Sequence, residues 1–80
     1  MAITLVESSR DHVTLDLGDG RCVRYAGEWH LPGPQSPGFV LYSNHVQAAG
    51  GGLLDGPDLE AALDAFRQYA ARESWKYEID

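Results

Sequence analysis

The sequence predicts an α+β fold in which a mostly antiparallel sheet of four or five strands carries one helix on one face. Three observations predict this architecture. Short segments of alternating apolar and polar residues indicate strands, one long segment has apolar residues at helical spacing, and glycine- and proline-rich connections separate them. With 80 residues, 44% apolar and 10% aromatic, the chain makes one small folded domain over residues 1–80. The expected order of elements is β-β-β-β-α-β.

The first part of the chain predicts a three-stranded meander. Residues 2–7 and 12–17 alternate as strands around the polar turn at 8–11, and residues 21–26 indicate a third strand. A two-residue turn before the third strand would mix polar and apolar faces, whereas a three-residue loop at 18–20 keeps the faces matched. That loop sets opposite one another Leu15 and Val23, Val13 and Tyr25, Asp16 and Cys22, and Thr14 and Arg24.

Two long connections flank a short fourth strand. Residues 27–38 contain three prolines and three glycines and predict an irregular loop, residues 39–43 predict a strand, and residues 44–56 predict a second loop. Three consecutive glycines at 50–52 precede a helix, a setting in which proteins bind phosphate. No Lys or Arg lies nearby in the sequence and acidic residues crowd the helix start, so these glycines are interpreted as a flexible connector.

The helix is the clearest predicted element. Pro57 suits the first helical position, with Gly56 or Asp55 as the cap, and the helix is expected to end near Arg72 or Glu73. An apolar stripe at helical spacing predicts the buried face, with Tyr69 at its edge: Leu59, Ala62, Leu63, Phe66 and Ala70.

A closing strand is expected after the helix, because residues 75–79 alternate with Trp75, Tyr77 and Ile79 on one face. One helix covers one face of such a sheet. The opposite face is expected to stay exposed or to meet a partner, and it would carry His12, Thr14, Asp16, Cys22 and Arg24.

Charge disfavours one class of function. Six Lys and Arg against twelve Asp and Glu give a formal net charge of −6 and a pI near 4.8. Direct binding to DNA or RNA needs basic side chains that displace counterions from phosphates, so it is not expected. An acidic surface instead favours a basic protein partner, including one whose own role is to hold nucleic acid.

Neither a signal peptide nor a membrane span is expected. The N-terminal residues lack a basic region followed by an apolar run, and no segment approaches ~18 consecutive apolar residues. Cys22 is the only cysteine, so no internal disulfide forms, which fits a reducing cytoplasm. We expect a cytoplasmic protein that is a monomer or a weak homodimer.

The start of the helix carries the candidate partner-binding residues, namely the carboxylates Asp55, Asp58, Glu60 and Asp64. Such a cluster has two interpretations. Acidic residues near a helix N-terminus complement the helix dipole, and the cluster is then a solvated face. Glu60 and Asp64, however, are like charges four residues apart, which dipole matching does not require, and this favours a contact surface. The candidate surface extends to Glu78, Asp80 and Trp29, where Trp29 is either a lid over the core or a partner anchor.

No catalytic, metal or cofactor site is predicted. Cys22 would be a nucleophile candidate with His12, His30 or His45 as its base, and His12 is expected on the same sheet face, but no local signature surrounds this cysteine and an inert thiol is favoured. The three histidines, at positions 12, 30 and 45, lack the short spacings of a zinc site. Residues 16–20 resemble part of a calcium loop without its ligand ladder or closing Glu. We expect a non-enzymatic protein.

In its small size, acidity and compact sheet-plus-helix form, the whole chain resembles the anti-CRISPR proteins of phages and mobile elements. The resemblance does not extend to a motif. It implies an inhibitor that binds a CRISPR-Cas effector, of the type I Cascade-like kind, through an acidic surface and blocks target DNA binding in the host bacterial cytoplasm, in a form of DNA mimicry. The alternatives are a small structural or self-associating phage or bacterial domain, or a protein of the antitoxin or immunity type.

Overall fold

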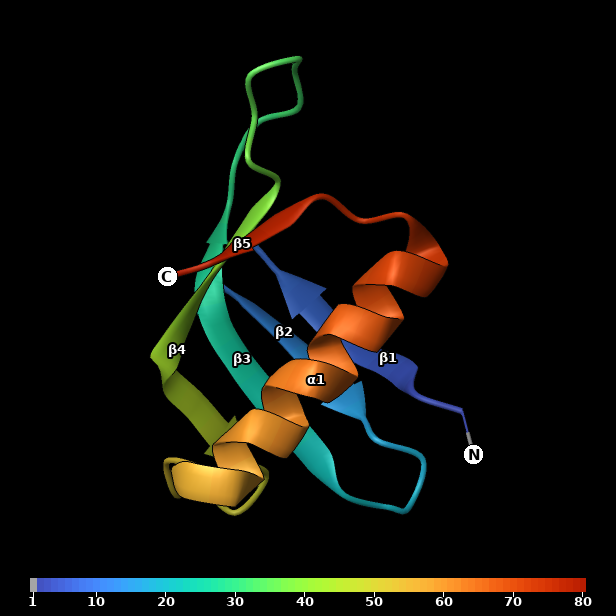
Figure 1. Ribbon diagram of the computed structural model, residues 1–80, viewed down its shortest axis with the longest axis vertical. Helices are drawn as coiled ribbons and strands as arrows, with labels where there is room; N and C mark the ends of the chain where they lie inside the picture. The colour runs from blue at the N-terminus through green and yellow to red at the C-terminus, as the bar shows by residue number, and fades with distance from the viewer. Residues whose placement is uncertain (1) are drawn as a thin grey trace.

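The computed structural model describes residues 2–80 as five strands and one helix in a single sheet-and-helix unit (Figure 1). The strand order across the sheet is β1-β2-β3-β4-β5. The first four strands are antiparallel neighbours, and β5 joins β4 in parallel after the helix has crossed the sheet. The predicted fold class and element order are confirmed. The elements are β1 (Thr4–Ser9), β2 (His12–Asp16), β3 (Cys22–Trp29), β4 (Phe39–Ala48), α1 (Gly56–Glu73) and β5 (Tyr77–Ile79).

The register of the β2–β3 hairpin is the one that the three-residue loop predicts. Leu15 lies opposite Val23 and Val13 opposite Tyr25. The loop at 18–20 closes with a hydrogen bond from the Leu17 N–H to the Arg21 carbonyl, 2.9 Å long. Gly20 has φ of +86°, a value that favours glycine, and this explains why the loop has a glycine at its third position.

The two predicted loops, 27–38 and 44–56, are shorter than the sequence indicated. Strand β3 continues through Trp29 and β4 through Ala48, which leaves 30–38 and 49–55 as the connections. The prediction failed at 27–29 because a register shift next to Gly27 breaks the alternation while the pairing continues. A Cβ atom on Gly27 would lie 2.2 Å from the Val40 carbonyl oxygen, so a glycine is required for the strands to approach here.

The second half of β4 was missed because its only large apolar side chain is Val46, which points into the core between polar neighbours. The glycines that follow form a tight turn. The Ala48 N–H donates to the Gly52 carbonyl at 2.9 Å, and the Gly51 N–H donates to the Ala48 carbonyl at 2.8 Å. Gly51 has φ of +98°, which again favours glycine. This segment is therefore a hydrogen-bonded turn at the end of β4, with no basic side chain beside it in the sequence.

Helix α1 begins and ends where its sequence predicts. Asp55 is the N-cap residue, with extended backbone and no side-chain capping hydrogen bond, and Pro57 lies in the first turn. At the other end Ser74 adopts the left-handed conformation, with φ of 59°, and the Trp75 N–H donates to the Ala70 carbonyl at 2.8 Å. The turn at Ser74 directs the chain back toward β5.

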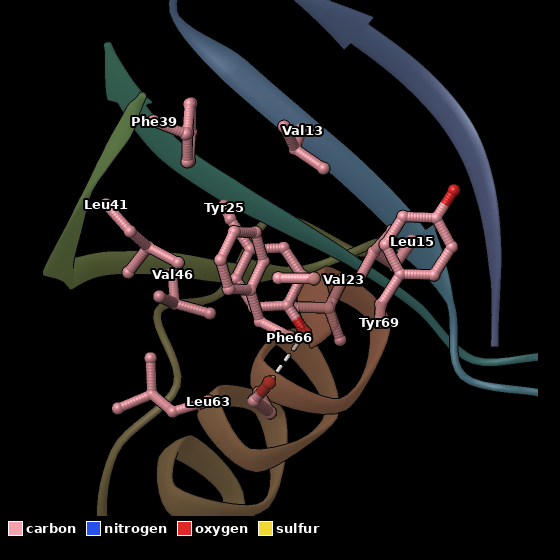
Figure 2. Packing of buried hydrophobic residues seen from close by; sticks show 12 residues of the cluster. Val13, Leu15, Val23, Tyr25, Phe39, Leu41, Val46, Leu63, Phe66 and Tyr69 are labelled. Atoms are coloured by element: carbon pink, nitrogen blue, oxygen red, sulfur yellow. Dashed lines mark hydrogen bonds between the residues drawn. The ribbon is translucent and has the colours of Figure 1, made fainter. Parts of the chain in front are cut away.

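The core lies between α1 and the covered face of the sheet (Figure 2). Phe66 is fully buried, with ring centroids of Tyr25 and Tyr77 at 5.2 and 5.4 Å. The Tyr25 hydroxyl donates to the Ala62 carbonyl at 2.7 Å and ties the helix to β3, while burial raises the pKa of this tyrosine. Tyr69, expected at the edge of the stripe, is buried, because β1 and β2 extend the sheet beneath it.

The other face of the sheet has no covering layer among the described residues (Figure 1). Register places Asp16, Thr14 and Arg24 there, as the alternation predicts. His12 also lies on this side, but it is buried rather than exposed, because neighbouring polar side chains surround its ring.

Candidate functional site

The four carboxylates at the start of α1 do not form one patch. A helix turns about 100° per residue, so Glu60 and Asp64 lie about 40° apart on the side away from the sheet. Asp58 is about 120° or more around the helix from both of them, and it borders the sheet side. All three are exposed. The structure therefore divides the predicted surface into an outer pair, Glu60 and Asp64, and a helix-start pair, Asp55 and Asp58.

A cavity of about 280 Å³ lies beside the helix-start pair, between the first turns of α1, the β2–β3 turn and the end of β4. All three segments lie at the same end of the molecule (Figure 1). Its walls are mainly apolar, and Val23, Leu54 and Ala61 line it together with Asp58. Most of the other lining residues are small. The full remaining set is Leu17, Gly20, Arg21, Cys22, Ala48, Ala49 and Ala62.

Small side chains explain why this space is open. The cavity is lined by alanines at 61 and 62 on the helix and by alanines at 48 and 49, where β4 ends, and Gly20 has nothing within 4 Å of the position of a Cβ atom. Larger residues at these positions would fill the space, as they do in the centre of the core. The cavity is thus a consequence of residue size at one end of the helix–sheet interface.

Of the two charged side chains that line this cavity, Arg21 has an ion-pair partner and Asp58 has none within the described residues. Arg21 is already paired, since its Nε donates to Asp19 at 2.7 Å and its backbone N–H donates to the same carboxylate at 3.0 Å. The hydrogen bond from the Arg21 backbone, followed by that from its side chain, lowers the pKa of Asp19. Within residues 2–80, Asp58 forms no ion pair. Its carboxylate is therefore available to a cationic group from outside the molecule.

The outer pair has a local partner instead. The Gln68 Nε2 donates to Asp64 at 2.9 Å, one turn along the helix. This contact is of the kind that stabilises helix surfaces by about 0.2–0.5 kcal/mol. It offsets the repulsion between Glu60 and Asp64 that the sequence offered as an argument for a contact surface.

The other predicted residues lie far from the helix start. Trp29 belongs to the end of β3 rather than to a loop, and its ring lies 5.0 Å from that of Phe39 and 5.1 Å from that of Trp75. It is half-buried, as a lid over the core would be. Glu78 and Asp80 belong to the β5 end of the chain, which Figure 1 shows away from the first turns of α1.

Glu78 belongs to a second acidic surface that the sequence analysis did not predict. Glu28, Val40 and Glu78 are cross-strand neighbours on β3, β4 and β5, on the uncovered face of the sheet. The Tyr42 hydroxyl lies 3.5 Å from Glu28, beside the same row. We call these four residues the acidic strip. A prediction of this strip required the pairing of Glu28 with Val40, which falls in the segment assigned to a loop.

A buried histidine network lies on the same face, at the end of the β1–β2 hairpin. The His12 Nε2 lies 2.6 Å from a Glu7 oxygen, and its Nδ1 lies 2.7 Å from the Ser9 hydroxyl and 3.0 Å from Asp11. The hydrogen bonds to Glu7 and then Asp11 raise the pKa of His12, against burial and the charge of Arg24. The hydrogen bonds from His12 and Ser9 lower the pKa of Asp11.

A bulge in β1 creates this network. Leu5 pairs with Leu15 but Glu7 pairs with Thr14, so one extra residue, Val6, is inserted between them. Without it, Glu7 would fall on the side of the sheet that faces the helix. The bulge places its carboxylate on the uncovered face, within reach of His12.

The thiol and the imidazole that the sequence analysis weighed as a catalytic pair are apart. Cys22 lies opposite Asp16 and His12 lies opposite Ala26, four residues further along β3. At about 3.3 Å per residue this separates the two backbone positions by about 13 Å. Within the described residues, no group of three His, Cys, Asp or Glu side chains is arranged to hold a metal ion.

Comparisons with known proteins give no family for this chain. A scan against protein-family models, a search of curated proteins and a search of solved structures each returned no match. Over residues 2–80, α1 is not apolar enough to qualify as a membrane-crossing helix. The functional argument therefore depends on the surfaces described above.

Proposed function

We propose that this protein is a non-enzymatic inhibitor that binds a basic, nucleic-acid-handling protein and blocks its nucleic-acid surface. The observation that carries the proposal is the helix-start pair, Asp55 and Asp58: both are exposed and form no ion pair within the described residues, and Asp58 lines an apolar cavity. Carboxylates replace phosphates in contacts with Lys and Arg through charge-assisted hydrogen bonds.

The proposed target is a CRISPR-Cas effector of the type I Cascade-like kind, so that the protein acts as an anti-CRISPR in the bacterial cytoplasm. A nuclease toxin neutralised by an antitoxin or immunity protein presents the same chemistry, because its active site also binds phosphates through basic side chains. The net charge of −6 supports attraction to either target. The identity of the bound protein separates the two.

The uncovered sheet face offers less support to the alternative of a self-associating domain. Glu28 and Glu78 lie on either side of Val40 in the acidic strip, so two copies stacked face to face would bring like charges together. A basic partner would meet no such repulsion there, and the strip is a second contact surface that the experiment below includes.

The test begins with capture of a partner on the tagged protein from a bacterial lysate, at low and high salt, with identification by mass. The expected partner is basic, is released by salt, and loses nucleic-acid binding when the protein is added in equal amount. A CRISPR effector or a nuclease toxin would support the proposal. Salt-insensitive pairing with a second copy of the chain would contradict it.

Three matched variants then locate the contact. Each removes two negative charges with isosteric changes: Asp55→Asn with Asp58→Asn, Glu60→Gln with Asp64→Asn, and Glu28→Gln with Glu78→Gln. Because the change in net charge is the same, a difference between the variants reports position alone. We expect the first pair to weaken binding most, by about tenfold or more, as removal of charges at an interface does. Equal small losses for all three would mean that only net charge matters.

A charge change at Glu7, away from the helix, would not be a suitable control for these variants. Its carboxylate lies 2.6 Å from the buried His12, so Glu7→Lys would disturb the fold as well as the charge. The outer pair is the better control because both residues are exposed and on the same helix.

A further inference from the structure

We propose that the cavity beside Asp58 receives one aromatic side chain of the partner, from a segment that also carries a Lys or Arg. This inference rests on the proposed function and names the chemistry of the partner at that site. An apolar cavity of about 150 Å³ is enough to hold a benzene molecule. The volume here, about 280 Å³, accommodates a larger ring system such as the indole of a tryptophan.

The lining selects an apolar group. Val23, Leu54 and Ala61 come from β3, from the connection before α1 and from the helix itself, so three separate segments would contact the occupant. An apolar side chain that leaves water for such a site is stabilised in proportion to the apolar area that it buries. Aromatic side chains are the residues most often found as interface anchors in pockets of this kind.

Charge selects the neighbour of that group. Asp58 borders the cavity without an ion pair in the described residues, whereas Arg21 is ion-paired with Asp19 through its Nε. A cation next to the anchor would pair with Asp58, and an anion there would be repelled by Asp58 and by the helix-start charge of Asp55. The preferred occupant is therefore an aromatic residue flanked by basic ones.

The test uses three capped tripeptides as probes: Lys-Trp-Lys, Glu-Trp-Glu and Lys-Ala-Lys. Their binding to the ¹⁵N-labelled protein is followed by amide chemical shifts. Lys-Trp-Lys should shift the amides of Val23, Ala49 and Ala61, and the other two probes should bind at least about tenfold more weakly, because each lacks one of the two interactions.

Two variants of exposed helix alanines provide the matched control. Ala61→Leu places a larger side chain in the cavity wall. Ala71→Leu makes the same change near the C-terminal end of the helix, outside the cavity. Both keep a good helix former at the position. We expect Ala61→Leu to weaken Lys-Trp-Lys binding about tenfold and Ala71→Leu to leave it unchanged. Asp58→Asn should reduce the preference for Lys-Trp-Lys over Glu-Trp-Glu.

Several results would overturn the inference. Equal binding of Lys-Trp-Lys and Glu-Trp-Glu would show that the charge beside the ring does not affect binding. Binding of Lys-Ala-Lys as tight as that of Lys-Trp-Lys would leave charge as the only interaction. Absence of shifts at millimolar probe would exclude an anchor site. Captured partner that binds Ala61→Leu normally but not the Asp55 and Asp58 variant would refute this inference while the proposed function stands. Loss with Ala61→Leu alone would instead refute the carboxylate contact of the proposed function.

Discussion

Phe66→Ala tests whether the interface between α1 and the sheet is the source of stability in this protein. The ring of Phe66 is fully buried and contacts aromatic rings from three strands and from the segment after the helix. Its partners are Tyr25, Phe39, Trp75 and Tyr77, with centroid distances from 5.2 to 6.4 Å. Removal of the ring leaves a cavity bordered by β3, β4, β5 and Trp75, which cannot easily close.

The size of the effect follows from that burial. Truncation of a buried Phe to Ala costs about 3–5 kcal/mol, as lost transfer free energy plus the cavity. A chain of 80 residues has a free energy of unfolding of about 4–12 kcal/mol, from about 0.05–0.15 kcal/mol per residue. The variant therefore loses a large share of its stability, and its melting temperature falls by at least about 12 °C.

Urea unfolding followed by tryptophan fluorescence measures this loss, because Trp75 lies against Phe66. Phe66→Leu keeps most of the apolar volume and should cost less than about 1.5 kcal/mol. Its free energy of unfolding can therefore be measured even if the alanine variant does not fold. Arg67→Ala, exposed and one residue away, should stay within about 0.5 kcal/mol of the parent. A loss below about 1.5 kcal/mol for Phe66→Ala would refute the packing described here.

Three further perturbations test single contacts. The pKa of His12 is raised above its ordinary 6.5, so its network stabilises the fold fully below about pH 6.5 and loses this contribution as pH rises through the folded pKa. His12→Gln should flatten that pH dependence of the free energy of unfolding in urea titrations. A difference between parent and variant that does not change with pH would contradict this. Gly38→Ala should lower the melting temperature strongly, because a Cβ atom would lie 1.9 Å from a backbone oxygen at a φ of +77°, whereas Gly33→Ala meets open space and should change little. Amide exchange should be slower at the hydrogen-bonded N–H groups of the turn at 48–52 than at the N–H groups of residues 31–35. Equal exchange rates would show that the turn opens freely.

The sequence was sufficient for the fold where alternation and turn chemistry agreed. Leu15 and Val23 belong to regular alternating segments, and the loop between them has glycine at the position that needs a positive φ, so one register satisfied both conditions. The second half of β4 carried no such signal, because a single inward side chain, Val46, does not distinguish a strand from a loop.

The candidate site was less predictable, because it depends on residue volumes and on irregular pairing. The cavity exists only where Ala61 meets the alanines at the end of β4, and those positions are distant in sequence. The His12 network depends on the bulge at Val6, which reverses the side on which Glu7 falls. Neither feature follows from local periodicity, which assigns faces only while the pairing is regular.

Of the four carboxylates near the start of the helix, Asp58 rather than the outer pair has the surroundings that the proposed function needs. In the sequence, Glu60 and Asp64 favoured a contact surface, because like charges four residues apart are mildly unfavourable in a helix. In the structure, the Gln68 amide donates to Asp64 at 2.9 Å and offsets that repulsion, and neither Glu60 nor Asp64 lines the apolar cavity. Asp58 has the opposite surroundings, with apolar walls beside it. Since a charge pair strengthens when water is excluded, Asp58 is where a single carboxylate would contribute most to binding a basic partner.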